Sequence, residues 1–314
     1  MKRAFVFPGQ GSQAPGMGKA LAEAFAPARL LFADVDDALS QHLSRLMFEG
    51  PESELMLTEN AQPALLAVSL AVIRTLEAEA GFDIARHAAY VAGHSLGEYS
   101  ALAAAHALSV ADAVRLVKRR GQAMQRAVPV GEGAMAALLG LDIEIAREVA
   151  RAAWDGGYIC AVANDNSPGQ IVVSGHTEAV ERAVALAAER GARRSIMLPV
   201  SAPFHCPLMA PAAEIVAEAL DEFPLAAPAT PLVANVTAAA TTDPEEIRDL
   251  LIEQVTRMVR WRETVLLFKE NEVEEVVEIG AGRVLSGLVK RIDRELATVS
   301  IGAPPEIEAF VERL

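Results

Sequence analysis

The segment from Val91 to Ser109 reads VAGHSLGEYSALAAAHALS. Its apolar start is typical of a buried strand, and the small and apolar residues after Leu96 follow a helical pattern. Between the two lies GHSLG, residues 93–97, which fits the pattern Gly-x-Ser-x-Gly of a nucleophile elbow. A strand that turns directly into a helix here predicts an α/β fold with Ser95 at the turn.

The sharp turn explains why the motif has glycine at both ends. A direct strand-to-helix turn holds its serine in a strained backbone conformation, and side chains two positions away on either side would collide with neighbouring chain. The turn lifts the Oγ of Ser95 clear of the sheet, and the N–H of Leu96 then faces the place where an oxyanion forms. The pattern alone also matches tight turns without chemistry, but its position between strand and helix favours a nucleophile.

Strand-like and helix-like patterns alternate on both sides of this motif. Residues 3–9 and 88–93 predict buried strands, and residues 63–81 predict a long apolar helix that ends at Gly81. The same alternation continues with helices at 96–106, 111–127 and 244–254, strands at 232–236 and 273–280, and a helix from Arg283. This order predicts an α/β-hydrolase-like core with a short, mainly parallel sheet.

A different order of elements fills roughly residues 133–199. The patterns there run strand, helix, strand, strand, helix, strand, with Asp142 as the expected cap of the first helix and NDNSPGQ (164–170) as the turn between the middle strands. This is the ferredoxin-like signature β-α-β-β-α-β. We therefore expect residues 129–199 to form an inserted ferredoxin-like subdomain, with residues 1–128 and 200–314 as the α/β core.

Composition excludes several classes of protein. The formal net charge is −14, from 42 acidic and 28 basic residues, whereas a nucleic-acid-binding protein normally has a basic footprint. No run approaches the ~20 apolar residues of a membrane span, and MKRAFVFPGQ at the start lacks the apolar region of a signal peptide. The two cysteines provide no disulfide framework. We expect a soluble cytoplasmic protein.

A serine nucleophile needs a base within hydrogen-bond reach, and the chain has six histidines. His94 leaves the backbone in a different direction from Ser95, and most of the others lie at element ends or in surface-like segments. His205, in PVSAPFHCPLM, follows a strand and precedes a helix, which suits a base, although a structural histidine is an equal alternative on spacing alone. Cys206 beside it is expected to be a small packed residue.

The segment FPGQGSQ, residues 7–13, follows the first strand and superficially resembles a phosphate loop. It lacks the third glycine of a dinucleotide fingerprint, because position 14 is Ala14, and Lys19 is not followed by Ser or Thr as in a Walker loop. A Gly-Gln-Gly turn at a strand end can still offer backbone N–H groups to an anion. This loop is therefore a candidate for the second oxyanion donor.

Together these residues resemble the malonyl-CoA:acyl carrier protein transacylase family. The matching segments span almost the whole chain in family order: FPGQGSQ, QPALLAVSLAV, GHSLGEYSAL, RGQAMQRAVPVGEGAMAALLGL, NSPGQIVVSG, PVSAPFHCPLMAPAAE and VEEVVEIGAGRVLSGLVKRI. The resemblance implies a malonyltransferase that uses malonyl-CoA and acyl carrier protein and needs no metal or redox cofactor. We expect a monomer, although the sequence leaves the oligomeric state open.

The resemblance also implies residue roles. Ser95 matches the nucleophile that carries the malonyl ester, His205 its base, and Arg120 the arginine that pairs with the malonyl carboxylate, which a planar guanidinium can grip with two hydrogen bonds. Arg119 is expected to face elsewhere. Other matches are Gln10 and Leu96 as backbone oxyanion donors, Gln254 as the residue whose carbonyl orients the histidine in place of a triad acid, and Phe204 as the bulky residue that favours malonyl over methylmalonyl groups.

One departure from the family is visible: many relatives have a proline after the position of Gln254, whereas here the run is VTRMVRW. Docking of an acidic carrier protein needs a local basic area, and the candidates are Arg190–Arg194 and the pair Lys290 and Arg291. The alternatives are solvated helix ends for these cations and, for the protein, a serine hydrolase or thioesterase, the malonyl transferase of a malonate decarboxylase, or a non-catalytic scaffold.

Overall fold

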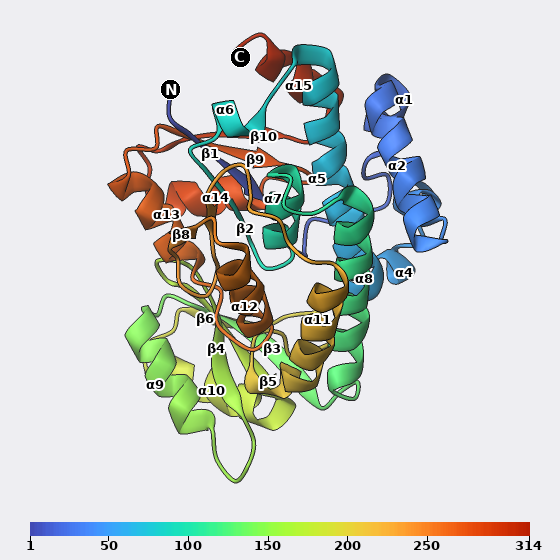
Figure 1. Ribbon diagram of the computed structural model, residues 1–314. Coiled ribbons are helices and arrows are strands. Elements are labelled where there is room, and N and C mark those ends of the chain that lie inside the picture. Colours follow the sequence, from blue (N-terminus) through green and yellow to red (C-terminus); the bar gives the residue numbers. More distant parts are fainter.

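The computed structural model describes residues 1–314, and its larger part is built around the sheet that carries the elbow (Figure 1). The strand order is β10-β9-β1-β2-β7-β8, and all neighbours are parallel except β7 and β8. The strands are β1 (Arg3–Phe7), β2 (Tyr90–Gly93), β7 (Leu232–Val233), β8 (Ala240–Thr241), β9 (Glu275–Ile279) and β10 (Ala297–Ile301). The predicted α/β class with a mainly parallel sheet is confirmed.

Helices cover both faces of this sheet. The helices of this larger part are α1 (Lys19–Ala24), α2 (Ala26–Leu39), α3 (Leu43–Glu49), α4 (Glu52–Leu55), α5 (Thr58–Ala80), α6 (Ile84–His87), α7 (Gly97–Ala104), α8 (Val110–Ala127), α11 (Ala210–Glu222), α12 (Pro244–Gln254), α13 (Trp261–Glu270), α14 (Val284–Ile292) and α15 (Pro304–Val311), with a short 3₁₀ helix, η1, at Pro207–Met209. Along β1 the side chains alternate: Ala4 and Val6 pack with α13 and α14, while Phe5 and Phe7 join the core around α5. Two-sided burial explains why residues 4–7 of β1 are apolar without interruption.

The long apolar helix expected at residues 63–81 is α5, which begins five residues earlier. It is the one helix long and apolar enough to cross a membrane by length and composition, but 83% of its most apolar window is buried in the protein. We therefore assign α5 to the core. The helix predicted at 96–106 ends at Ala104, because His106 adopts a left-handed φ of 60° that no α-helix contains.

The second sheet is antiparallel, has the order β4-β5-β3-β6, and occupies the lower part of Figure 1. Its elements are β3 (Gly133–Leu139), α9 (Ile143–Ala153), β4 (Cys160–Ser167), β5 (Gln170–His176), α10 (Thr177–Glu189) and β6 (Arg194–Met197). The predicted element order is present, and the Asp142 side chain caps α9 by accepting from Ile145 N. Ala136 and Leu138 face α9 and α10, whereas Met135 and Ala137 join the main core. One face of this sheet thus packs against the larger part.

The turn expected at residues 164–170 is wrong in extent, because only residues 168 and 169 separate β4 from β5. The polar residues before them belong to β4, which is irregular at Asn164 and again before Ser167. The backbone of β4 is also held on its other side, where Asp165 N donates to Val259 O (3.0 Å) and Val259 N donates to Ala163 O (2.9 Å). These tertiary hydrogen bonds keep a turn-like sequence extended.

Candidate active site

The elbow has the predicted shape. Ser95 has a φ of 53°, a left-handed value that few non-glycine residues adopt. A Cβ on Gly93 would lie 1.8 Å from the carbonyl carbon of Gly97, and one on Gly97 would lie 2.0 Å from Phe7 O. Both glycines are therefore required by close backbone contact, and the turn brings Ser95 to the carboxyl edge of the sheet between β1 and β2.

The structure brings His205 to Ser95. Nε2 of His205 lies 2.7 Å from Oγ of Ser95 across 110 residues of sequence. His205 is 4% exposed, has a left-handed φ of 57°, and lies on the loop between β6 and η1. Its other ring nitrogen, Nδ1, lies 2.8 Å from Gln254 O. Because a carbonyl oxygen can only accept, Nδ1 carries the hydrogen and Nε2 is left to accept one from Ser95.

The carbonyl of Gln254 is available because α12 ends at this residue. The last carbonyls of an α-helix have no partner within the helix, and here His205 supplies one. The missing proline in VTRMVRW has not displaced this carbonyl. Burial is the main cause that lowers the pKa of His205 to about 3, and the Arg120 cation adds to the effect. The imidazole is therefore neutral and can take a proton.

Arg120 comes from α8 and is 1% exposed. Its Nη2 donates to Ser95 Oγ (3.0 Å) and to Gln254 Oε1 (2.9 Å), while Nη1 donates to Gln62 Oε1 (2.7 Å). No carboxylate forms an ion pair with it. Its neighbour Arg119 faces away, as expected, and pairs with Glu222 at the surface (2.5 Å). A buried guanidinium with no carboxylate within ion-pair distance is suited to an anionic group of a substrate.

The two predicted oxyanion donors also lie at this point. Neither Gln10 N nor Leu96 N donates to a backbone carbonyl, so both N–H groups are free. A Cβ on Gly9 would lie 2.6 Å from His94 O, which shows how closely the loop after β1 packs on the elbow. The side chain of Gln10 is held by a hydrogen bond of its own, in which Thr58 Oγ1 donates to Gln10 Oε1 (2.7 Å).

A cavity of about 330 Å³ opens beside Ser95. It is bordered by the polar groups of Gln10, Arg120 and His205 and by apolar side chains that include Met124 and Phe204. Phe204 is 9% exposed. A wider, more open hollow of about 710 Å³ touches His205 from its other side but contains neither Ser95 nor Arg120. The smaller cavity is the one in which an acyl group could meet all the polar groups.

Several polar residues of the site were not predicted from the sequence. Asn235 Oδ1 accepts from Ser95 N (2.8 Å), and Glu98 Oε2 accepts from Gln254 Nε2 (2.8 Å). Gln62, which contacts Arg120, is a completely buried amide at the start of the apolar stretch of α5. A lone polar residue within an apolar run, as in QPALLAVSL and LVANV, was the available signal, since buried polar groups need partners.

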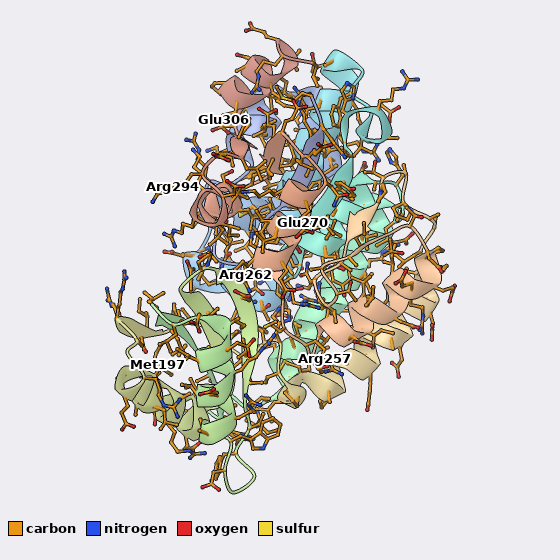
Figure 2. The ribbon with its side chains drawn as sticks, turned by 90° about the vertical axis from the view of Figure 1, so that its left-hand side faces the viewer. Met197, Arg257, Arg262, Glu270, Arg294 and Glu306 are labelled. Atoms are coloured by element: carbon orange, nitrogen blue, oxygen red, sulfur yellow. The ribbon has the colours of Figure 1, made fainter.

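His94 links the two parts of the molecule instead of serving the serine. Its Nε2 lies 2.8 Å from Asn166 Oδ1 on β4. Figure 2 shows Arg262 at the same boundary, where its Nε lies 2.9 Å from Oδ2 of the buried Asp165. Cys206 is completely buried, as expected of a packed residue. The bulged end of β4 is thus fastened to the elbow and to α13.

Comparisons with known proteins agree with this class of site. Residues 4–301 match the family described as acyl transferase domain, so the fold and site define an acyl transferase. The chain is 48% identical over 313 residues to a malonyl CoA-acyl carrier protein transacylase of Bacillus subtilis, with 100% of this chain and 97% of the relative covered. The relative of that name in Escherichia coli K12 is 44% identical over 310 residues, with 98% of each covered. The chain belongs to the malonyl-CoA:acyl carrier protein transacylase family.

Solved structures are equally similar. An acyl-carrier-protein-S-malonyltransferase from Bartonella henselae has a TM-score of 0.97 and 52% identity, with 100% of this chain and 99% of that chain covered. A malonyl-transacylase solved in complex with a type II PKS acyl-carrier protein has a TM-score of 0.95 and 42% identity over 100% of both chains. The mixed fold with two separate sheets is therefore that of the family.

Proposed function

We propose that this protein moves a malonyl group from coenzyme A to the thiol of an acyl carrier protein through an ester on Ser95. The observation that carries the proposal is the position of one hydroxyl: Oγ of Ser95 lies 2.7 Å from the base His205 and 3.0 Å from the guanidinium of Arg120. The first pair can activate a nucleophile, and the second can hold an acyl group that ends in a carboxylate.

The reaction has two matching halves. His205 Nε2 takes the Ser95 proton while Oγ attacks the thioester carbonyl, and the N–H groups of Gln10 and Leu96 hold the oxyanion. The carbon–sulfur bond then breaks, and His205 returns the proton to the departing coenzyme A thiolate. In the second half His205 takes the proton of the carrier thiol, sulfur attacks the seryl ester, and Ser95 Oγ recovers its proton.

Arg120 couples recognition of the substrate to the strength of the base. Its positive charge is one cause of the lowered pKa of His205. A malonyl carboxylate bound to the guanidinium offsets that charge, which raises the basicity of His205 when the correct acyl group is present. An acetyl group carries no carboxylate and gives neither the ion pair nor this effect.

Phe204 supports a preference for malonyl over methylmalonyl groups. Its ring is nearly buried and borders the cavity beside His205. A branch on the α-carbon of the acyl group needs additional space in a cavity of about 330 Å³. In close-packed surroundings, one extra methyl group is sufficient to disfavour binding.

We assign docking of the carrier protein to Arg194 in preference to Arg190 and Arg291. Arg194 is exposed on β6, and the chain after β6 forms part of the cavity wall at Leu198 and Val200. By contrast, Arg190 is paired with Glu148 (2.8 Å) and Arg291 donates to Gln170 Oε1 (2.5 Å). A free cation on the strand that leads to the cavity wall suits an acidic partner.

We also propose the remaining assignments that follow from the family. Residues 129–199 form a ferredoxin-like subdomain, residues 1–128 and 200–314 form an α/β-hydrolase-like core, and the protein acts as a monomer in the cytoplasm. The separate apolar cluster between the second sheet and helices α9 and α10 supports this division.

The decisive experiment is intact-mass analysis after mixing with malonyl-CoA. An added malonyl group, mapped to the peptide GHSLGEYSAL, is expected. Release of the group to carrier protein supports the transferase, whereas rapid release to water without acceptor identifies a hydrolase. Transfer to the prosthetic group of a malonate decarboxylase, with none to a fatty-acid carrier protein, identifies the other malonyltransferase.

A further inference from the structure

Glu98 is a buried carboxyl that the mechanism above does not use. It lies in the first turn of α7, three residues after Ser95, and is 1% exposed. Its Oε2 accepts two hydrogen bonds, from Gln254 Nε2 (2.8 Å) and from Asn235 N (3.1 Å). A buried carboxyl lowers stability unless hydrogen bonds or nearby charges compensate it.

Gln254 connects Glu98 to the reacting groups. Its backbone carbonyl accepts from His205 and its side-chain Oε1 accepts from Arg120, while its Nε2 donates to Glu98 and to Ser95 O (3.0 Å). An amide side chain can face either way, and only its partners decide which end is the acceptor. The guanidinium of Arg120 requires the oxygen of this amide to point toward it.

An ionised carboxylate is the one common side chain that only accepts hydrogen bonds. Glu98 therefore attracts the NH₂ of Gln254 and leaves the Oε1 end for Arg120. A side chain at position 98 that could also donate would leave Ser95 O and Asn235 Oδ1 (3.3 Å) as the remaining acceptors for the NH₂ end. The preference against the reversed amide, in which the N–H groups of Gln254 face those of Arg120, would then be weaker.

We infer that Glu98 is a positioning residue that fixes the orientation of the Gln254 amide, and that it thereby aims Arg120 at the malonyl carboxylate. This inference rests on the proposed function. Glu98 touches neither Ser95 Oγ nor the cavity, so its effect is on the choice of acyl group more than on the chemistry common to all of them. Glu98 also accepts from Asn235 N, and Asn235 Oδ1 accepts from Ser95 N. We therefore expect Glu98 to have a second, smaller effect on the position of Ser95.

The test compares acylation of Ser95 by malonyl-CoA and by acetyl-CoA, measured as single-turnover rates by intact mass. Glu98→Gln keeps the size of the side chain but can donate, so the ratio of malonyl to acetyl rates is expected to fall about tenfold or more. Glu98→Asp remains an acceptor only and is expected to retain a ratio between those of Glu98→Gln and the wild type. An unchanged ratio in Glu98→Gln overturns the inference.

Glu278 offers a matched control. It is another completely buried carboxyl and accepts from Leu285 N (3.0 Å) and Ser286 N (2.8 Å) at the start of α14. Glu278→Gln is expected to lower the free energy of unfolding and leave the malonyl-to-acetyl ratio unchanged. A merely structural Glu98 would behave in the same way, so the ratio separates positioning from packing.

A measurement on the wild-type protein covers the case in which Glu98→Gln does not fold. Burial is the main cause that raises the pKa of Glu98 to about 7. The charged or titratable groups that face it are Arg120 from α8 and Tyr99 from its own helix, while the other neighbours contribute the uncharged Gln254 and Asn235. The malonyl-to-acetyl ratio is therefore expected to fall as the pH drops through about 7. A ratio that is constant from pH 6 to pH 8.5 overturns the inference.

The proposed function and this inference fail in different ways. A wild-type protein that gains no malonyl group on Ser95 overturns the proposed function and the inference with it. A wild-type protein that is acylated, with a Glu98→Gln variant that keeps the wild-type ratio, overturns the inference alone.

Discussion

His205 is oriented by the backbone carbonyl of Gln254, which lies 2.8 Å from its Nδ1 at the end of α12. A carboxylate in this position would stabilise the imidazolium that forms when Ser95 loses its proton. A carbonyl supplies the orientation with only a partial charge. The base is consequently weaker, and the surrounding cation, Arg120, makes its strength depend on what the cavity contains.

Ser95→Ala is expected to abolish the malonyl adduct, because no other side chain offers a nucleophile between His205 and the free N–H groups. Intact-mass analysis with malonyl-CoA measures this directly. Cys206→Ala is the control, because the Cys206 thiol is buried and donates a hydrogen bond to Pro203 O (3.1 Å), away from the serine. An adduct that persists in Ser95→Ala removes Ser95 from its assigned role.

Arg120→Ala is expected to reduce acylation by malonyl-CoA roughly a hundredfold, and acylation by acetyl-CoA far less, because only the malonyl group loses an ion pair with the buried guanidinium. Single-turnover rates with the two substrates test this. Arg119→Ala, on the exposed side of the same helix, is the matched control and should leave both rates close to wild type. Equal losses with both substrates in Arg120→Ala contradict the assignment.

The pH dependence of stability should reveal the neutral state of His205. Its pKa is lowered to about 3 in the folded protein, so its contribution to stability is complete above about 6.5 and is lost as the pH falls toward 3. His205→Asn lacks this contribution. Between pH 8 and pH 5 the wild type is therefore expected to lose about 2 kcal/mol of unfolding free energy relative to His205→Asn.

Urea unfolding at the two pH values measures this difference. Ionisable groups common to both proteins cancel in the comparison, including Glu98. A difference between the two proteins that does not change with pH shows that His205 is protonated as readily in the folded protein as in the unfolded chain.

Phe204→Ala is expected to increase acylation by methylmalonyl-CoA relative to malonyl-CoA, because the smaller side chain leaves space for the α-methyl branch. Competition between the two thioesters, read by mass, gives the ratio. Phe223→Ala removes the same volume at the end of α11, outside the cavity, and should not change it. A ratio unaffected by Phe204→Ala returns this residue to a packing role.

Arg194→Glu is expected to raise the KM for carrier protein severalfold and leave the KM for malonyl-CoA unchanged, since reversal of a rim charge mainly weakens attraction to an acidic partner. Steady-state transfer assays at low ionic strength measure both constants. Lys290→Glu tests the alternative basic area in the same assay. If only Lys290→Glu raises the KM for carrier protein, docking belongs to that side of the molecule.

Local features of this fold could be predicted from the sequence, because they depend on neighbours in the chain. The elbow at Ser95 and the capped helix after Asp142 are of this kind. The prediction of a turn at residues 164–170 was wrong because Val259, almost a hundred residues later in the sequence, holds β4 extended. No local propensity contains that information.

The site shows the same division. Ser95 could be predicted as the nucleophile from its own motif. For His205, a base and a structural histidine were equal alternatives on spacing alone, and the family resemblance decided between them. The carbonyl of Gln254 could not have been found by residue type, since every residue has a backbone carbonyl. Glu98 and Asn235 were missed because their partners come together only when α7, α12 and the loop after β7 pack.

The hydrogen bonds between β4 and Val259, together with the pairs His94–Asn166 and Asp165–Arg262, join the second sheet to the elbow and to the start of α13 beside the site. These contacts oppose relative movement of the two parts that form the cavity. Donors and base stand at their working distances before any thioester arrives, so little reorganisation energy remains for the substrate to supply.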